Sequence, residues 1–188
     1  MKIRDIFSDL PTLETERLIL RKFTLDDVEN MFGYASKPEV SRFVPWEAHR
    51  SVEDSYNFIN YILKQYEVGK LALWAIALKE NNKVIGTIDF VDWSPSHYRA
   101  EIGFILSKDY WGKGLNVEAG KKVIQFGFNR MELNKIEAPC MVENARSQRV
   151  LQKLGMKLEG ILREKYFIKG KFRDMAVYSI LKNEYKNK

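Results

Sequence analysis

Apolar residues alternate with polar ones in some segments of this chain and recur at a spacing of three to four in others. Alternation is typical of half-buried strands, and the wider spacing is typical of helices that bury one side. With the turns between them, these patterns predict seven strands, at residues 15–23, 71–78, 84–91, 98–106, 135–142, 156–168 and 171–181. They also predict four helices, at residues 24–35, 51–69, 117–131 and 145–155.

Two helix starts carry their own signal. Thr24 is followed three residues later by Asp27, and Ser51 by Asp54, which resembles a capping box with aspartate in place of glutamate. The stretch 38–45, bracketed by prolines, is expected to be irregular. Because no repeat, low-complexity segment or Pro/Ser-rich linker divides the chain, residues 1–188 are predicted to form a single α+β domain with a mixed, mostly antiparallel sheet.

Composition limits the classes of protein that need to be considered. The chain has 188 residues, of which 45% are hydrophobic and 30% charged, as expected of a soluble globular protein. The longest apolar run, 71–78, is far too short to span a membrane, and residues 1–9 lack the apolar stretch of a signal peptide. A single cysteine excludes an internal disulfide and suits the cytoplasm. Two distant histidines and one cysteine do not favour a zinc site, so no metal is expected.

The formal net charge of +6 favours an anionic partner. The basic residues are dispersed apart from a concentration at 163–173, and no nucleic-acid-binding motif accompanies them. Charge alone therefore leaves two alternatives open, a polyanionic cofactor and association with nucleic acid or the ribosome.

A glycine loop between a predicted strand and a predicted helix, Tyr110-Trp111-Gly112-Lys113-Gly114, is the strongest candidate for an anion site. The first N–H groups of a helix have no partner within the helix and carry partial positive charge, so they bind phosphate well. Glycines let the backbone approach such a ligand closely, and Lys113 adds a cation. The loop is not a Walker loop, because no Ser or Thr follows Lys113, and Val117 stands where a dinucleotide-binding loop has its third glycine.

Together with its neighbours, this loop resembles the GNAT superfamily of acyl-CoA-dependent N-acetyltransferases. Within that superfamily the chain is most similar to the RimJ/RimL-type branch, which acetylates protein N-termini. The resemblance extends from about residue 15 to residue 181, and its markers occur in the family's order: 16–21, Gly86, 100–104, 110–114, Glu118-Ala119, 136–138, 144–147, 154–156 and Glu159-Gly160.

The resemblance implies a GNAT fold, with a sheet of about seven strands, helices on both faces, and a splay between strands four and five that receives pantetheine. Gly103 would permit a bulge there, with an ordinary packing glycine as the alternative. Acetyl-CoA would be the acyl donor, with the loop amides on its pyrophosphate. The family's Arg/Gln-x-x-Gly-x-Gly/Ala pattern falls on 111–116, where Asn116 replaces a small residue. The implied cofactor-binding residues are Phe104, Ile105, Leu106, Trp111, Gly112, Lys113, Gly114, Leu115, Asn116, Asn144 and Ser147.

Two residues carry the chemistry that the resemblance implies. Glu101 matches a strand glutamate that serves as general base, and partial burial would raise its pKa toward neutrality; the alternative is an ion pair with Arg99 or a lysine. Ser147 matches a serine that donates to the departing thiolate, with a first-turn helix serine as the alternative. The backbone N–H groups of residues 104–106 are the expected oxyanion donors.

Other residues are assigned lesser roles. Trp46 and Glu47 lie where the family places substrate-facing loops and are the candidates for gripping the acceptor amine. Cys140 is expected to be buried and Glu137 to form a structural ion pair. Arg146 is expected on the solvated surface, with a position beside the cofactor as the alternative.

The leading hypothesis is direct acetyl transfer from acetyl-CoA to a protein N-terminal α-amine, such as that of a ribosomal protein. The alternatives are transfer to a small amine (a polyamine or an aminoglycoside-like antibiotic), CoA sensing without catalysis, and nucleic-acid or ribosome binding. Ribosome association and a homodimer are further expectations, and no membrane partner is expected.

Overall fold

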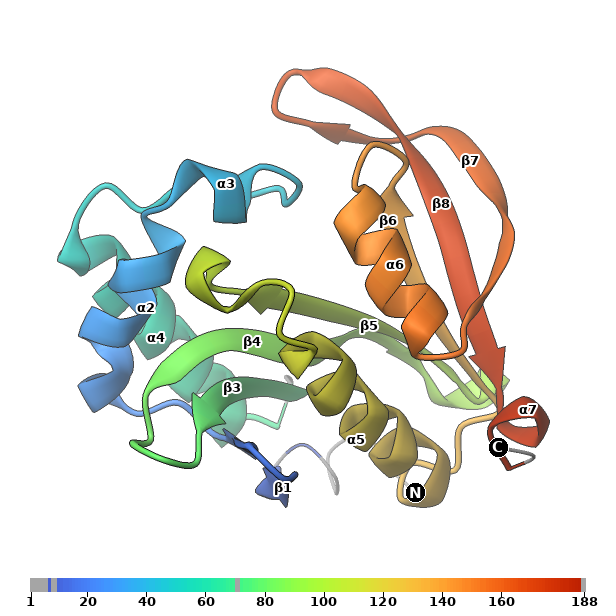
Figure 1. The fold of residues 1–188 in the computed structure, drawn as a ribbon, viewed down its shortest axis with the longest axis horizontal. Coiled ribbons are helices and arrows are strands. Elements are labelled where there is room, and N and C mark those ends of the chain that lie inside the picture. Colours follow the sequence, from blue (N-terminus) through green and yellow to red (C-terminus); the bar gives the residue numbers. More distant parts are fainter. Residues whose placement is uncertain (1–6, 8–9, 70–71, 187–188) are drawn as a thin grey trace.

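The computed structural model describes residues 7, 10–69 and 72–186. Most of residues 1–9, to which the expectation about a signal peptide refers, and Leu71 of the second predicted strand lie outside these residues. The described part contains one eight-stranded sheet in the order β1-β2-β3-β4-β5-β6-β8-β7 (Figure 1). The strands are β1 (Leu13–Glu14), β2 (Leu18–Arg21), β3 (Ala72–Leu78), β4 (Val84–Ser94), β5 (Arg99–Leu106), β6 (Lys135–Met141), β7 (Lys157–Ile168) and β8 (Lys171–Leu181). The helices are α2 (Val28–Ala35), α3 (Pro38–Ser41), α4 (Val52–Glu67), α5 (Leu115–Asn129), α6 (Ala145–Lys153) and α7 (Lys182–Lys186).

The sheet is antiparallel except between β5 and β6. These two strands pair in parallel only from Arg99–Lys135 to Glu101–Glu137, and beyond Glu101 they share no register (Figure 1). They are the fourth and fifth predicted strands, so the predicted splay and the mostly antiparallel sheet are confirmed. The two-residue strand β1 brings the total to eight.

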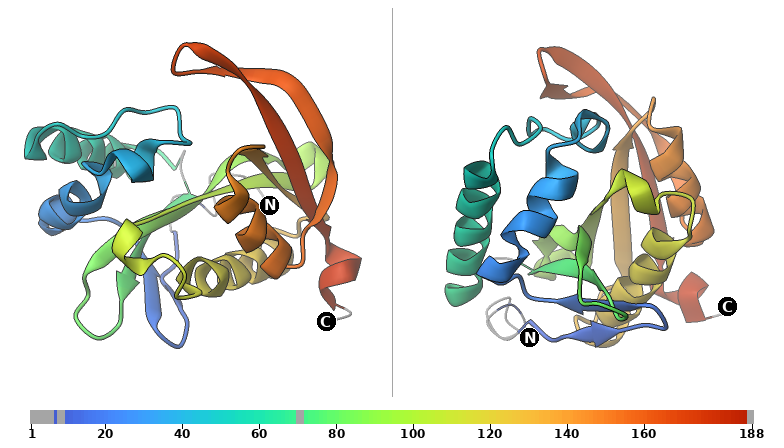
Figure 2. Two further views of the ribbon diagram at one scale, coloured as in Figure 1. Left: turned by 45° about the horizontal axis from the view of Figure 1, so that its top comes forward. Right: turned by 60° about the vertical axis from the view of Figure 1, so that its left-hand side comes forward.

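Helices cover both faces of the sheet (Figure 2). Helix α5 packs on one face, where a side chain at Gly127 would meet Phe90 and Ile136, and α6 joins it through Leu154 against Gly120. Helices α2 and α4 lie on the other face, where the Tyr66 hydroxyl donates to the Leu73 carbonyl at 2.6 Å.

The two faces of the β4–β5 pair differ in burial. Phe90, Ala100 and Ile102, which face α5, are buried, whereas four residues that point to the opposite face keep part of their surface exposed. We call these four residues the open strip: Asp89, Glu101, Gly103 and Ile105. The strip lies on the face of the sheet that carries α4, whose Tyr66 acts on Asp89.

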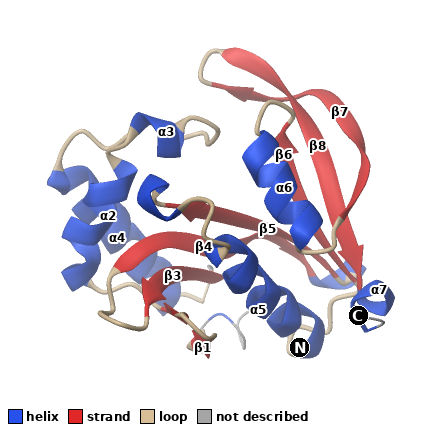
Figure 3. Cartoon of the chain, in the orientation of Figure 1, coloured by secondary structure: helices blue, strands red, loops and turns tan. Residues whose placement is uncertain are grey.

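Local signals account for the helix starts. The Asp27 carboxylate accepts from the Thr24 N–H at 2.9 Å, and the Asp54 carboxylate accepts from the Ser51 N–H at 3.1 Å, as the capping boxes predicted. The stretch 38–45 is not wholly irregular, because α3 begins at Pro38 (Figure 3). A proline fits the first position of a helix, where its missing N–H has no partner to lose.

The bulge expected at Gly103 lies instead on β4, between Phe90 and Asp92. Gly103 is a packing glycine, because a Cβ there would lie 3.0 Å from Asp89 Oδ1 and 2.8 Å from Val91 Cγ2. The alternative that the sequence left open is therefore the correct one. The extra residue on β4 sets which carboxylates face the open strip.

The long β7–β8 hairpin turns at Lys169 and Gly170, which have φ of 52° and 74°. Its tip reaches back to the segment that follows α3, where Lys169 Nζ donates to the Ser41 carbonyl at 2.8 Å and lies 3.6 Å from Glu47. The hairpin thereby bounds the side of the molecule on which the open strip lies. Among the described residues, no helix has the length and apolar character needed to cross a membrane.

Candidate active site

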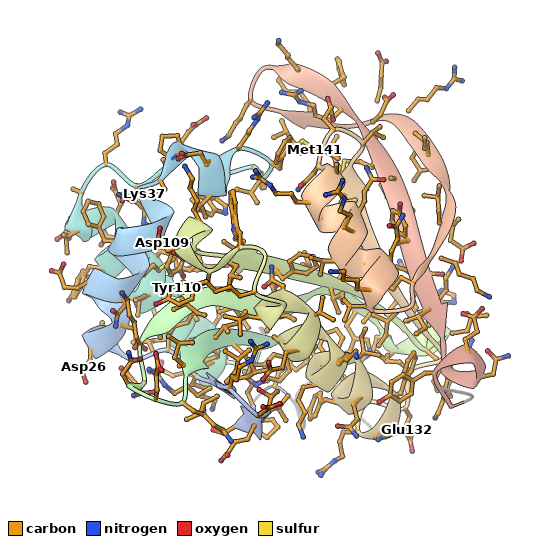
Figure 4. All side chains as sticks on the ribbon, viewed as in Figure 1. Asp26, Lys37, Asp109, Tyr110, Glu132 and Met141 are labelled. Carbon is orange, nitrogen blue, oxygen red and sulfur yellow. The ribbon has the colours of Figure 1, made fainter. Side chains whose placement is uncertain are left out.

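A cavity of about 590 Å³ lies between the end of β5, the segment that leads into α5, the α3 segment and α6. Figure 4 marks Tyr110 on the segment after β5 and Met141 at the end of β6, on either side of the region where the strands diverge. Ten of the eleven predicted cofactor residues line this cavity: Phe104, Ile105, Leu106, Trp111, Gly112, Gly114, Leu115, Asn116, Asn144 and Ser147. Lys113 does not line it, because its Nζ lies 4.9 Å over the Tyr110 ring on another side of the loop.

The glycine loop has the geometry of an anion site. Gly112 and Gly114 both have φ of 78°, in the left-handed region that favours glycine, and Gly114 is the N-cap of α5. The next residues therefore turn their N–H groups toward the cavity at the positive end of the helix. This is the arrangement that a pyrophosphate requires.

The loop is held in place by the first strands. Glu118, in the first turn of α5, accepts hydrogen bonds from the Thr15 hydroxyl at 2.6 Å and from Arg17 Nε at 2.7 Å. Arg17 Nη1 also donates to the Lys113 carbonyl at 3.2 Å. The sequence markers at 16–21 and 118–119 thus contact each other through Arg17 and Glu118, which neither marker shows alone.

Trp111 connects the loop to β5. Its Nε1 donates to the Leu106 carbonyl at 2.8 Å, and the Arg146 guanidinium stacks over its ring at 4.6 Å. Arg146 also lines the cavity, so its assignment to solvated surface was wrong. The stack joins α6 to the loop across the cavity and places a positive charge beside the anion site.

The Asn116 side chain tests whether these residues fit a cofactor. Its Oδ1 is buried and has no hydrogen-bond partner in the part of the chain that the structure describes. A buried polar atom without a partner is costly, and this amide lines the cavity. A bound ligand with hydrogen-bond donors, such as the amide and hydroxyl groups of CoA, would satisfy this acceptor, so the cavity fits a cofactor of that kind.

The free edge of β5 offers backbone donors. The Ser107 N–H donates to the Ile85 carbonyl of β4 at 2.7 Å. Because backbone groups alternate along a strand, the N–H of Ile105 also points to β4, and those of Phe104 and Leu106 point to the open edge. The Leu106 carbonyl on that edge is already bound by Trp111. Of the three expected oxyanion donors, Phe104 and Leu106 are therefore the ones that face the divergence of the strands.

Asn144 and Ser147 begin α6. The Asn144 side chain accepts from the Ser147 N–H at 3.2 Å and so caps the helix. The Ser147 hydroxyl, which faces the cavity, also lies beside the buried Cys140 thiol, whose pKa burial raises to about 11. Cys140 is buried as predicted and stays protonated at neutral pH. The cap is provided by Asn144, so the Ser147 hydroxyl is not needed for capping.

Glu101 lies on the open strip at the last paired position before the strands diverge. Burial raises the pKa of its carboxyl, while Lys165 and Arg99 oppose and Asp92 and Glu137 reinforce that rise. Arg99 Nη1 lies 3.7 Å from the Glu101 carboxylate. The ion pair that the sequence left open therefore exists, but Arg99 is closer to Glu137, at 3.1 Å, and is shared between them. Glu137 has the expected structural ion pairs.

Trp46 and Glu47 do not line the cavity. The Trp46 ring is half-buried and lies 5.6 Å from the His49 ring. The Glu47 side chain is 71% exposed and faces Lys169 of the hairpin. Their role in gripping an amine remains a prediction.

Sequence analysis did not single out one acidic residue that lies on the same face as Glu101. Asp89 interrupts an apolar run on β4 and shares the open strip with Glu101. An acidic residue between Ile88 and Phe90 could have signalled a special environment, but its facing toward Glu101 depends on the register of β4 against β5, which pairs Asp89 with Gly103.

Fold and site together define an enzyme of the group-transfer class, with a cavity for a phosphorylated cofactor on one side of a divided sheet and a carboxylate on the other. A family model described as an acetyltransferase (GNAT) domain matches residues 17–157. The uncharacterized N-acetyltransferase p20 of Bacillus licheniformis is 38% identical over 176 residues, which cover 94% of this chain and 99% of that relative.

Two further similarities are informative. The crystal structure of an acetyltransferase (GNAT family) from Bacillus anthracis has a TM-score of 0.82 and 31% identity, covering 93% of this chain and 100% of that one. Spermidine N(1)-acetyltransferase of Escherichia coli (strain K12) is 27% identical over 169 residues, 88% of this chain and 87% of that one. The chain belongs to the GNAT family and is an acetyl-CoA-dependent N-acetyltransferase.

Proposed function

We propose that this enzyme acetylates the N-terminal α-amine of a polypeptide, as RimJ/RimL-type enzymes do. The observation that carries this proposal is the pairing of the carboxylates around Glu101. Arg99 lies 3.4 Å from Asp92 and 3.1 Å from Glu137, and Lys135 lies 3.0 Å from Glu137. With Lys165 also acting on Glu101, this surface suits one ammonium group better than a polycation.

The cofactor residues would hold acetyl-CoA in a defined direction. The amides that follow Gly114 would bind the pyrophosphate, with Arg146 as a nearby cation. The free edge of β5 would receive the amides of pantetheine. The unpaired Asn116 Oδ1 would accept a hydrogen bond from a donor group of the ligand. Acetyl-CoA supplies the thioester whose acyl carbon is attacked.

The residues on the two sides of the sheet then divide the chemistry. Glu101, directly or through water, takes a proton from the acceptor ammonium, and the neutral amine attacks the thioester carbonyl. The C–N bond forms while the N–H groups of Phe104 and Leu106 stabilise the oxyanion. The C–S bond then breaks, and Ser147 donates a hydrogen bond to the departing thiolate. The second proton of the attacking nitrogen passes to the thiolate, so the products are the N-acetyl amine and the CoA thiol, and Glu101 returns its proton to solvent.

Acetylation of a small amine is the second candidate. The similarity to spermidine N(1)-acetyltransferase favours it, because that relative is named for a polyamine acceptor. The two candidates share the donor and the chemistry, so they differ only in what binds on the acceptor side.

A thiol-release assay with acetyl-CoA separates the candidates. We expect release with short peptides that begin with free Ala or Ser, and none with the same peptides blocked at the N-terminus. Spermidine and kanamycin should give little release. A dominant rate with spermidine would reject the peptide proposal in favour of the small-amine candidate. Silence across the panel despite measurable acetyl-CoA binding would favour a sensor.

Ser147→Ala is expected to lower kcat about tenfold, with little change in acetyl-CoA affinity. The effect should be smaller than the 10²–10⁴-fold typical of general acids, because a thiolate leaves readily without full protonation. Steady-state kinetics and calorimetric binding measure the two quantities. Ser147→Thr keeps the hydroxyl and should retain more activity than the alanine variant. Undiminished turnover in Ser147→Ala would remove the hydroxyl from the mechanism.

The proposal also covers the location of the enzyme, its association with the ribosome and its oligomeric state. A cytoplasmic location agrees with the free, buried Cys140. Ribosome association is supported by the net charge of +6. A homodimer is supported by the exposed apolar side chains of the β7–β8 hairpin, which are Leu158, Ile161, Leu162, Tyr166, Phe167 and Phe172.

A further inference from the structure

Asp89 occupies a central position on the open strip. It lies on β4 directly opposite Gly103 of β5, and its Oδ1 is 3.0 Å from where a Cβ at position 103 would be. The Asp89 carboxylate and the Val91 side chain therefore both pack against the β5 backbone at Gly103. Glu101 points to the same side as Gly103, two residues along β5, at a separation of about 7 Å. Protein surrounds Asp89, and only a small part of its surface stays exposed.

Asp89 differs from the other carboxylates of this face in its partners. Asp92, Glu101 and Glu137 all lie within 4 Å of Arg99. Within residues 10–69 and 72–186, no hydrogen bond or ion pair to the Asp89 carboxylate is found.

The ionisable groups around Asp89 do not compensate its charge. Helix α4 directs Tyr66 toward it, and the Tyr66 hydroxyl is already committed to the Leu73 carbonyl at 2.6 Å. Lys22 Nζ lies 5.5 Å from the centroid of the Tyr66 ring. Along β5, the next ionisable group on this side is Glu101, which is itself an acid. Burial raises the Asp89 pKa to about 7. A buried carboxylate without a partner is energetically unfavourable, because it has lost its hydration. A cationic ligand that pairs with it offsets this desolvation cost.

We propose that Asp89 binds the ammonium group of the acceptor on the open strip and holds it beside Glu101. This inference rests on the proposed transfer to an amine. Asp89 and Glu101 point to the same face of the β4–β5 pair, with the Val91 side chain packed against Gly103 beside Asp89, so an ammonium held by Asp89 lies on the same side of the sheet as the base. Asp89 is thus an acceptor-binding residue, and the transfer itself needs no further group.

Asp89→Asn should raise the KM for the acceptor at least about tenfold at pH 8, with a much smaller change in kcat and none in the Kd for CoA. Asp92→Asn, on the same strand, is the control, because the Asp92 side chain is 51% exposed and faces Arg99. In the native enzyme the acceptor KM should rise as the pH falls through about 7, since Asp89 then gains a proton. The rise should be absent from Asp89→Asn.

A measurement on the native protein does not depend on folding of the variant. The complex with CoA is used, because CoA has no acetyl group to transfer. In this complex the ¹³C carboxyl resonance of Asp89 should titrate with a midpoint near pH 7. Addition of a free Ala-peptide should move this midpoint to lower pH. The blocked peptide should have no effect. An unshifted titration, or an unchanged acceptor KM in a folded Asp89→Asn protein, would overturn the inference.

The outcome is separable from that of the proposed function. If spermidine proves to be the acceptor, the same kinetics and titration are made with spermidine. The peptide proposal then fails, while the role of Asp89 is still decided by its own KM and pKa. A purely structural Asp89 would lower the melting temperature without the selective change in acceptor KM.

Discussion

Glu101→Gln is expected to lower kcat/KM for the acceptor about 10²–10⁴-fold at pH 7, the range in which general bases act. Only the deprotonated carboxylate can take the proton from the ammonium. Because burial raises the Glu101 pKa, the native rate should rise with pH through this elevated value. Glutamine cannot accept the proton, so the variant should depend on spontaneous deprotonation of the amine. For an α-amine this occurs near pH 8, and the deficit should therefore shrink above that pH.

The check is a pH–rate profile of both proteins with a free Ala-peptide. Glu137→Gln is the matched control, because Glu137 pairs with Glu101 in register and contacts the same Arg99. It removes a neighbouring carboxylate but no proton acceptor, and its rate should fall less than about tenfold. A Glu101→Gln profile parallel to that of the native enzyme would show that Glu101 is not the base.

Gly114→Val should weaken CoA binding about ten- to a hundredfold. Gly114 has φ of 78°, a conformation that costs an ordinary residue about 1–2 kcal/mol and a β-branched one more. The loop would relax to a negative φ and turn the first N–H groups of α5 away from the pyrophosphate. Since about 1.4 kcal/mol corresponds to a tenfold change in affinity, loss of one or two such contacts gives the expected range.

Calorimetric titration with CoA measures this effect. Gly33→Ala is a suitable control, because Gly33 lies in α2 and a Cβ there meets nothing within 4 Å. It should leave CoA binding unchanged. Native affinity in a folded Gly114→Val protein would mean that the loop amides do not hold the cofactor.

Much of the fold could be predicted because its signals are local. Seven strands and four helices leave periodic patterns, and the capping residues Thr24 and Ser51 mark helix starts within a few positions. The prediction of elements failed where one residue type is compatible with two different local structures. Pro38 was taken for a breaker, although it starts α3 at the one helical position that tolerates it. The strand β1 is too short to leave a pattern.

The site was predictable to the same extent. The glycine loop is a contiguous motif, so its place at the start of α5 followed from the sequence. Asp89 could not be recognised, because it shares a face with Glu101 only through the register that pairs it with Gly103 of β5. The stacking of Arg146 on Trp111 joins segments far apart in the chain, and only the packing of α6 brings them together.

The most direct test of the central claim uses a peptide that carries both a free N-terminal α-amine and an internal lysine. With acetyl-CoA and the native enzyme, mass spectrometry of the product should find one acetyl group, on the α-amine, in step with the release of one CoA thiol. Acetylation of the lysine, or of neither amine while acetyl-CoA is bound, would contradict the account.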